Sequence, residues 1–159
     1  MTSIFIHGLD SSSKGTKASW FARNFPQMLV PDFKGSLEKR LTTLENVLAG
    51  KNDLLLIGSS FGGLMAAIFA IEQPETVREI VMLAPALNFP EFDNWRQRTS
   101  KTPARLYVGD HDDVCPPDKV IGAARKCFEN LTVQRTNDDH IMRKTFALID
   151  WGQIIRQAD

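Results

Sequence analysis

Residues 54–74 constrain the fold of this chain most strongly, because a short apolar run, a serine between glycines and a long apolar run follow without a break (LLLIGSSFGGLMAAIFAIEQP). The first run, within 53–58, is brief and rich in Leu and Ile, which is typical of a buried strand. The second, at 61–74, is apolar on nearly every side and ends at Pro74, which predicts a buried helix. A buried strand that leads into a buried helix is typical of a parallel sheet covered by helices on both faces.

The same alternation of short apolar runs and helical patterns continues along the chain. The other predicted strands lie at 3–8, 28–33, 79–85, 104–110 and 131–136. The other predicted helices lie at 14–25, 36–50, 116–128 and 140–157, and Gly152 is expected to interrupt the last. With 43% hydrophobic residues, the chain can build one well-packed core. We therefore expect an α/β fold with three αβα layers and a mostly parallel six-stranded sheet, in a single domain over 1–159.

Charge and hydropathy exclude several classes of function. Lys plus Arg and Asp plus Glu both number 19, so bulk charge offers nothing to a nucleic acid or an anionic membrane. No apolar run approaches the roughly 20 residues of a spanning helix, and the first residues lack the features of a signal peptide. We expect a cytoplasmic protein with no membrane or nucleic-acid partner, and the oligomeric state stays open. Cys115 and Cys127 lack the spacing of metal ligands and are expected to be reduced structural thiols.

The junction between the central strand and helix has the spacing Gly-x-Ser-x-Gly, from Gly58 to Gly62. A sharp strand-to-helix turn holds the middle serine in a strained conformation, and a side chain at either glycine would collide with neighbouring backbone. Ser60 would then project above the sheet as a nucleophile, with the Phe61 N–H directed at an oxyanion beside it. The alternative is a glycine-rich turn with a purely structural role.

A serine nucleophile needs a general base, and that base needs an orienting carboxylate. The chain has three histidines, at positions 7, 111 and 140. In a triad with the chain order Ser, acid, His, only His140 lies downstream of both Ser60 and the acidic cluster at 110–113. His140 is therefore the candidate base, and an exposed loop histidine is the structural alternative.

Four segments, taken in order, resemble those of the α/β-hydrolases, in particular the short bacterial esterases and serine hydrolases that lack a lid. They are FIHGLDSS, GSSFGG, GDHDDVCPP and DDH. The resemblance implies Ser60 as the nucleophile, His140 as the base and, from its Gly-x-x-Asp-x-x-x-Pro register, Asp112 as the acid. It also implies that the backbone N–H groups of Leu9 and Phe61 form the oxyanion hole.

The resemblance has further structural consequences. The chain begins at what would be the family's third strand, which implies six strands in the order 2-1-3-4-5-6. His7 is given a structural role in fixing its loop. The segment 86–103, where larger members insert a lid, is too short for a lid domain. Four aromatic residues are candidates for the substrate pocket, with ordinary packing as the alternative: Trp20, Phe89, Phe92 and Trp95.

Three aspartates lie within residues 110–113, and the residues alone leave the choice of acid among them open. Beside Asp112, we expect Asp110 to brace the turn and Asp113 to face solvent or begin the next helix. Asp138 and Asp139 adjoin His140 on its own loop, so we expect them to shape that loop. A metal site in DHDD is disfavoured, because the segment lacks the 12-residue calcium-binding pattern.

The expected function is hydrolysis of a small short-acyl ester or thioester through an acyl-enzyme, with no cofactor and no metal. Two alternatives remain. A non-catalytic protein with the α/β-hydrolase fold would bind a partner or small ligand. A third hypothesis keeps the triad and changes the bond that is cleaved to an amide, a peptide or a carbon–carbon bond.

Overall fold

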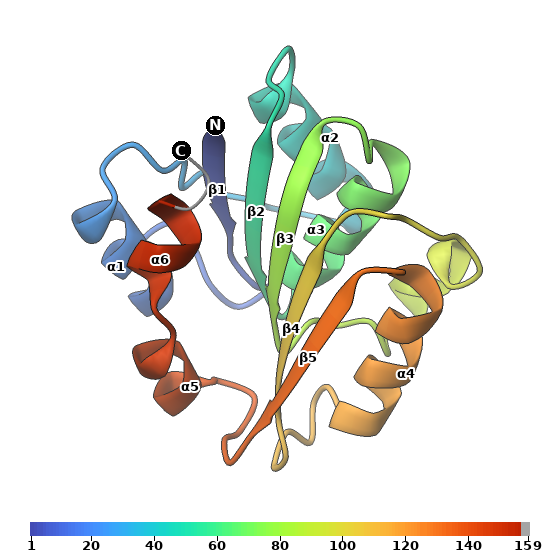
Figure 1. Cartoon of the computed structure of the whole chain (residues 1–159). Helices are drawn as coiled ribbons and strands as arrows, with labels where there is room; N and C mark the ends of the chain where they lie inside the picture. The colour runs from blue at the N-terminus through green and yellow to red at the C-terminus, as the bar shows by residue number, and fades with distance from the viewer. Residues whose placement is uncertain (157–159) are drawn as a thin grey trace.

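Five parallel strands form the centre of the protein, in the order β1-β2-β3-β4-β5 (Figure 1). The structure is a computed structural model and describes residues 1–156. The strands are β1 (Thr2–Ile6), β2 (Leu54–Ser59), β3 (Val77–Leu83), β4 (Ala104–Gly109) and β5 (Leu131–Thr136). Each overlaps a run that the sequence predicts, with ends that agree within two residues, so these five predictions are confirmed.

The sixth strand, predicted at 28–33, does not form, and that prediction was wrong. Leu29 makes an isolated bridge to β1: its N–H donates to the Ser3 carbonyl and its carbonyl accepts from the Phe5 N–H, both at 2.9 Å. The next residue that faces β1 is Pro31, which has no N–H to continue the ladder. The segment therefore lies on the edge where the order 2-1-3-4-5-6 puts its second strand, but as a single bridge.

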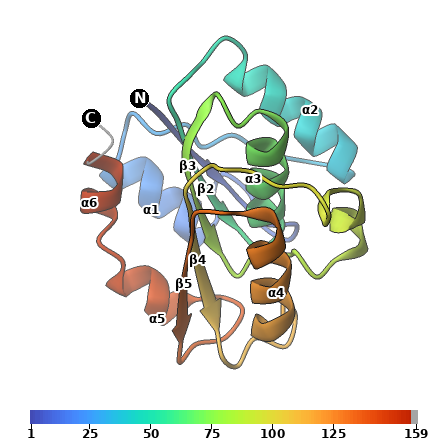
Figure 2. The ribbon, with the colours of Figure 1, turned by 45° about the vertical axis from the view of Figure 1, so that its right-hand side comes forward.

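Helices cover both faces of the sheet, which confirms the three-layer prediction (Figures 1 and 2). One face carries α1 (Thr16–Asn24), α5 (Arg143–Leu148) and α6 (Trp151–Arg156). The other carries α2 (Leu37–Leu48), α3 (Phe61–Glu72), α4 (Pro117–Cys127) and the 3-10 helix η1 (Pro90–Trp95). No helix within these residues has the length and apolar character that crossing a bilayer requires.

The helix expected at 140–157 is divided in two, and the break does not fall at Gly152. Ile149 leaves the helix with a ψ of 129°, and the Asp150 side chain then accepts a hydrogen bond from the Gln153 N–H at 2.9 Å. This is the contact of a helix N-cap, so α6 begins there and Gly152 lies inside it. Residue 157 lies outside the described part of the chain.

Strands β1 to β3 are buried on both faces because their apolar side chains alternate between two cores, whereas β5 at the edge of the sheet has no buried residue. On β2, Leu54 and Leu56 pack toward α3, whereas Leu55 and Ile57 pack toward α1 and α6. Phe61 to Ile71 of α3 are all buried, as the sequence predicts for the helix after the serine turn. Since all strands are parallel, their carboxyl ends lie along one edge, and the loops that follow β1, β2, β4 and β5 are brought together there.

Candidate active site

Ser60 occupies the turn between β2 and α3 in a conformation that few residues other than glycine adopt. Its φ is 55° and its ψ is −116°. A Cβ at Gly58 would lie 2.2 Å from the Gly62 carbonyl oxygen, and one at Gly62 would lie 1.9 Å from that of Ile6. Both flanking glycines are therefore required for the reason that the sequence predicts, and the turn holds the Ser60 side chain away from the sheet.

Ser60, His140 and Asp112 form one continuous chain of hydrogen bonds. The Ser60 Oγ lies 2.9 Å from His140 Nε2, and His140 Nδ1 lies 2.8 Å from Asp112 Oδ2. A carboxylate only accepts, so the proton is assigned to Nδ1, which leaves Nε2 free to accept from the serine hydroxyl. The Asp112 side chain is 1% exposed and that of His140 22%, so the acidic end is buried and the serine end is open.

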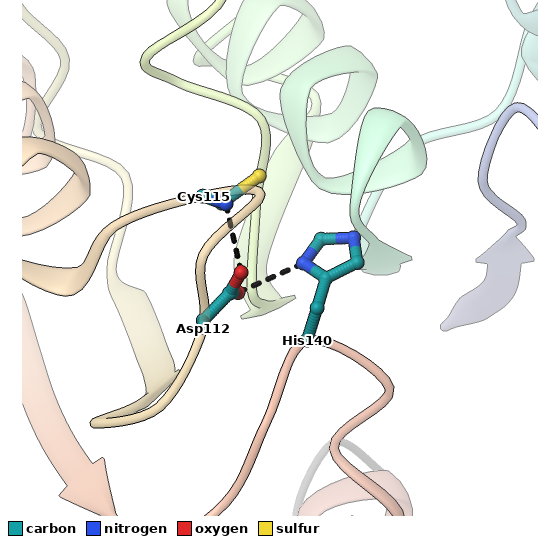
Figure 3. A group of neighbouring side chains, drawn as sticks. All are labelled: Asp112, Cys115 and His140. Carbon is teal, nitrogen blue, oxygen red and sulfur yellow. Dashed lines mark hydrogen bonds and ion pairs between the residues drawn. The ribbon is translucent and has the colours of Figure 1, made fainter.

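Backbone groups of its own loop hold the Asp112 carboxylate in place. Its Oδ1 accepts hydrogen bonds from the N–H groups of Val114 at 2.9 Å and Cys115 at 2.7 Å. Its Oδ2 accepts from the imidazole of His140, and Figure 3 shows the carboxylate between Cys115 and His140. With both oxygens occupied by donors, the carboxylate can orient the imidazole without rotating.

The other aspartates of this loop point elsewhere. Asp110 is exposed and its Oδ1 accepts from Arg135 Nε at 2.8 Å, so it braces the end of β4 against β5. Asp113 is exposed. The structure therefore directs only Asp112, among the clustered acids, at the histidine ring.

The loop that carries His140 is shaped by the two aspartates before it. The buried Asp138 accepts hydrogen bonds through Oδ2 from the N–H and the hydroxyl of Thr145, and through Oδ1 from the Asp139 N–H. Burial disfavours charge on Asp138, yet these donors outweigh it, and the pKa of its carboxyl lies below the usual range. Asp139 Oδ1 accepts from the Ile141 N–H at 3.0 Å. Both side chains thus hold the loop and leave the imidazole to Asp112.

The loop after β1 lies directly against the serine. A Cβ on Gly8 would lie 3.4 Å from that of Ser60. His7 is buried and bonded on both sides, because its Nδ1 lies 2.7 Å from the Gly8 carbonyl and its Nε2 accepts from the Phe33 N–H at 2.9 Å. His7 therefore fixes the loop that presents Leu9 beside Ser60.

A cavity of about 550 Å³ contains Ser60 and His140, a size within the range of small-molecule sites. Of the four aromatic pocket candidates, Phe89 lines it. Phe92 is fully buried in the core beside α3, and Trp95 packs on that core with its indole N–H on Glu72. Trp20 packs edge-on against Phe21 and Phe146. For these last three, the structure favours ordinary packing.

The cavity also contains residues that no motif singles out. Lys17 of α1 lines it, and its Nζ donates to the Ile141 carbonyl at 2.6 Å, across a sequence separation of 124. Val114 and Ile141 line it from the loops after β4 and β5. No sequence signal marks these three residues, because their proximity depends on how the loops close.

Asp112, Cys115 and His140 each offer an atom that could bind a metal ion, and these atoms lie within 4.8 Å of one another (Figure 3). A thiol binds metals as the thiolate. Burial, reinforced by the Asp112 carboxylate, raises the pKa of the Cys115 thiol to about 12. Because the carboxylate oxygens are already occupied as well, this donor set is poorly prepared for a metal.

The raised pKa also predicts that Cys115 is unreactive in the folded protein. With a pKa of about 12, roughly one thiol in ten thousand is ionised at about pH 8, and the side chain is buried. Iodoacetamide at that pH should leave Cys115 unmodified for hours in the native protein, and peptide mass spectrometry should find it alkylated once urea is added. Rapid stoichiometric alkylation without urea would contradict this microenvironment.

Three solved structures illustrate what the fold resembles. Mouse alpha/beta hydrolase domain-containing protein 10 is 18% identical, with a TM-score of 0.81 over 99% of this chain and 90% of that one. Est1E from Butyrivibrio proteoclasticus, solved with ferulic acid, is 15% identical, with a TM-score of 0.80 over 99% and 90%. An esterase from Pyrococcus furiosus is 18% identical, with a TM-score of 0.71 over 99% and 81%.

These likenesses establish that the chain has the α/β-hydrolase fold. Residues 2–146 match the profile of the uncharacterised protein family UPF0227, and the chain belongs to that family. The homoserine O-acetyltransferase of Pasteurella multocida (strain Pm70) is 28% identical over 109 residues, which are 66% of this chain. The chain spans only 29% of that enzyme's length.

Proposed function

We propose that this protein is a serine hydrolase that cleaves small carboxylic esters or thioesters through an acyl-enzyme. The observation that carries the proposal is the chain of hydrogen bonds from Ser60 through His140 to the buried Asp112, at 2.9 and 2.8 Å. A nucleophile, a base within reach and a buried acid that orients the base are the groups that acyl transfer requires.

In the first half of the reaction, the Ser60 Oγ attacks the ester carbonyl while His140 Nε2 takes the hydroxyl proton. The carbonyl electrons move onto oxygen, and the N–H groups of Leu9 and Phe61 would bind that oxyanion. When the tetrahedral intermediate collapses, the C–O bond to the alcohol breaks and His140 returns the proton to the leaving oxygen. Asp112 stays ionised and stabilises the imidazolium between these two transfers.

In the second half, a water molecule replaces the alcohol. His140 removes a proton from water as it attacks the acyl carbon, and it then protonates Ser60 Oγ as the carboxylic acid leaves. The steps balance without any redox change, and no cofactor or metal enters them. The 22% exposure of the His140 side chain is consistent with the access that water needs.

A second candidate is transfer of the acyl group to an alcohol, which uses the same acyl-enzyme with a different acceptor. The similarity to a homoserine O-acetyltransferase over 66% of this chain supports this second candidate function. The two functions are distinguished by adding homoserine or glycerol to the assay. An acyl transferase would form the new ester at the expense of free acid, whereas a hydrolase would form the acid at an unchanged rate.

The proposed hydrolase should prefer short acyl chains. Residues 86–103 provide no lid domain, and each buried methylene contributes only about 0.8 kcal/mol. We expect kcat/KM for p-nitrophenyl esters to be highest at roughly two to six acyl carbons, with no jump at the micelle threshold. A kcat/KM that keeps rising to long-chain esters would contradict this prediction. Separately, loss of activity in EDTA would indicate a mechanism that depends on a metal ion.

A further inference from the structure

Residues 1–156 have five large apolar side chains that are strongly exposed, and three of them lie around one cavity. Leu9 is 45% exposed, Val114 45% and Ile141 55%, and all three line the cavity that contains Ser60. Single exposed apolar side chains are ordinary on a protein surface, whereas their concentration at one site needs an explanation. We refer to Leu9, Val114 and Ile141 as the apolar rim.

Each residue of the apolar rim follows a different strand and adjoins part of the proposed catalytic apparatus. Leu9 follows β1 and carries one of the proposed oxyanion donors in its own backbone. Val114 follows β4, and its N–H donates to Asp112 at 2.9 Å. Ile141 follows β5 and is the neighbour of the proposed base. An alkyl group that packs on this rim is therefore held in a fixed position relative to Ser60.

The exposure of Ile141 is not the result of a loose loop. Its N–H donates to Asp139 Oδ1 at 3.0 Å, and its carbonyl accepts from Lys17 Nζ at 2.6 Å. Burial lowers the pKa of the Lys17 amine, as expected of a side chain enclosed by the same cavity. With both backbone groups bonded, the isoleucine side chain is held facing outward.

We propose that the apolar rim binds the alkyl chain of the substrate and sets the chain-length specificity of the enzyme, an inference that rests on the proposed hydrolase function. A group that covers the rim also lies over Ser60 and His140 in the same cavity, so the occupant is the substrate itself. The alkyl chain can belong to the acyl group or to the alcohol, and both present the same surface to the rim.

The rim predicts a measurable gain for each added methylene. Full burial of a methylene corresponds to about a fourfold gain in kcat/KM, and the half-exposed rim should give roughly two- to fourfold per carbon. The gain should stop once the chain extends past the rim. Replacing rim side chains by serine should remove most of it.

Two homologous ester series test this proposal. One lengthens the acyl chain of a p-nitrophenyl ester from acetate to hexanoate, and the other lengthens the alcohol of an acetate ester. Each is measured with the native protein, with the double variant Val114→Ser/Ile141→Ser and with Leu148→Ser. Leu148 is a matched control because it is 85% exposed and lies outside this cavity. Ratios of kcat/KM to the shortest ester within each protein cancel any general loss of activity.

In one of the two series, kcat/KM should rise about two- to fourfold per added carbon in the native protein and in the Leu148→Ser control. In the same series, the double variant should gain less than about 1.5-fold per carbon. A flattened acyl series identifies the acyl chain as the bound group, and a flattened alcohol series identifies the alcohol. Equal gains in kcat/KM in all three proteins, with normal turnover of the shortest ester, would overturn the proposed role of the apolar rim and leave the hydrolase function intact. Absence of turnover in the native protein would overturn the hydrolase function and the rim with it.

Discussion

Replacing Ser60 by alanine is expected to lower kcat for ester hydrolysis by about six orders of magnitude, in practice to the background rate. The hydroxyl is the only group placed 2.9 Å from His140 Nε2 in the described residues, so its loss leaves the base with no nucleophile to activate. Initial rates with p-nitrophenyl acetate measure the effect. The hydrogen bonds of Asp112 to the histidine ring and to its own loop do not involve the hydroxyl, so the fold should persist.

Two further variants separate chemistry from stability. Ser13→Ala removes a hydroxyl outside the cavity and should keep native turnover. Ser60→Gly should be as inactive as Ser60→Ala but more stable, because a φ of 55° suits glycine and the strain relieved is about 1 kcal/mol or more. Thermal unfolding followed by circular dichroism gives the comparison. Substantial turnover by either Ser60 variant would exclude Ser60 as the nucleophile.

Replacing Asp112 by asparagine is expected to lower kcat by about four orders of magnitude. The amide retains the shape of the side chain, and its oxygen can still accept from the Val114 and Cys115 N–H groups. Its NH₂ group then faces His140 Nδ1 as a donor, which favours the tautomer with the proton on Nε2. The base then cannot accept the Ser60 proton. Pre-steady-state release of p-nitrophenolate isolates this acylation step.

Asp113→Asn is the matched control for that variant, because Asp113 adjoins Asp112 and its side chain is exposed. It should retain kcat within about twofold, as surface substitutions away from a site usually do. Asp110→Asn loses the charge that pairs with Arg135 and is expected to reduce stability slightly. If either of these variants showed the severe loss of kcat with normal unfolding, Asp112 would not be the acid.

The sequence predicts the fold well where burial is two-sided. The run at 53–58 and the helix after it are apolar on all faces, and both form as expected because the two cores of the protein bury them. The segment at 28–33 also begins with apolar residues, but Pro31 and Asp32 interrupt it, and it makes only one bridge at the edge of the sheet. A proline inside such a run is the sequence signal for an edge position, and here it outweighs the apolar residues.

The same contrast holds for the candidate site. The Gly-x-Ser-x-Gly spacing predicts the strained turn at Ser60, since the constraint is local to the backbone. The direction of each aspartate in the loop after β4 depends on long-range contacts, such as the Asp138 carbonyl lying 2.4 Å from where a Gly109 Cβ would be. The resemblance selects Asp112, and the structure brings that carboxylate to His140. Its catalytic role stays a prediction.

The sequence pattern does not predict which of the aromatic candidates lines the cavity. Phe89 and Phe92 lie three positions apart in one short segment, yet Phe89 lines the cavity and Phe92 is buried in the core. Phe89 precedes η1 as its N-cap, in an extended conformation with a ψ of 148°, whereas Phe92 lies inside the helix and belongs to the core that contains α3. Phe89 is only partly buried against that core. Val114 and Ile141 of the apolar rim meet at the cavity only because the loops after β4 and β5 fold toward each other, so no sequence pattern predicts their proximity.

Intact-mass spectrometry after treatment with a fluorophosphonate tests the central claim most directly, because this reagent reacts with serines that an adjacent base activates. The native protein should gain one adduct, and peptide mapping should locate it on Ser60. The Ser60→Ala variant should gain none, and Asp112→Asn should react much more slowly. An unmodified native protein would contradict the proposed activity and favour a non-catalytic binding protein, and an adduct retained in Ser60→Ala would show that the nucleophile lies elsewhere.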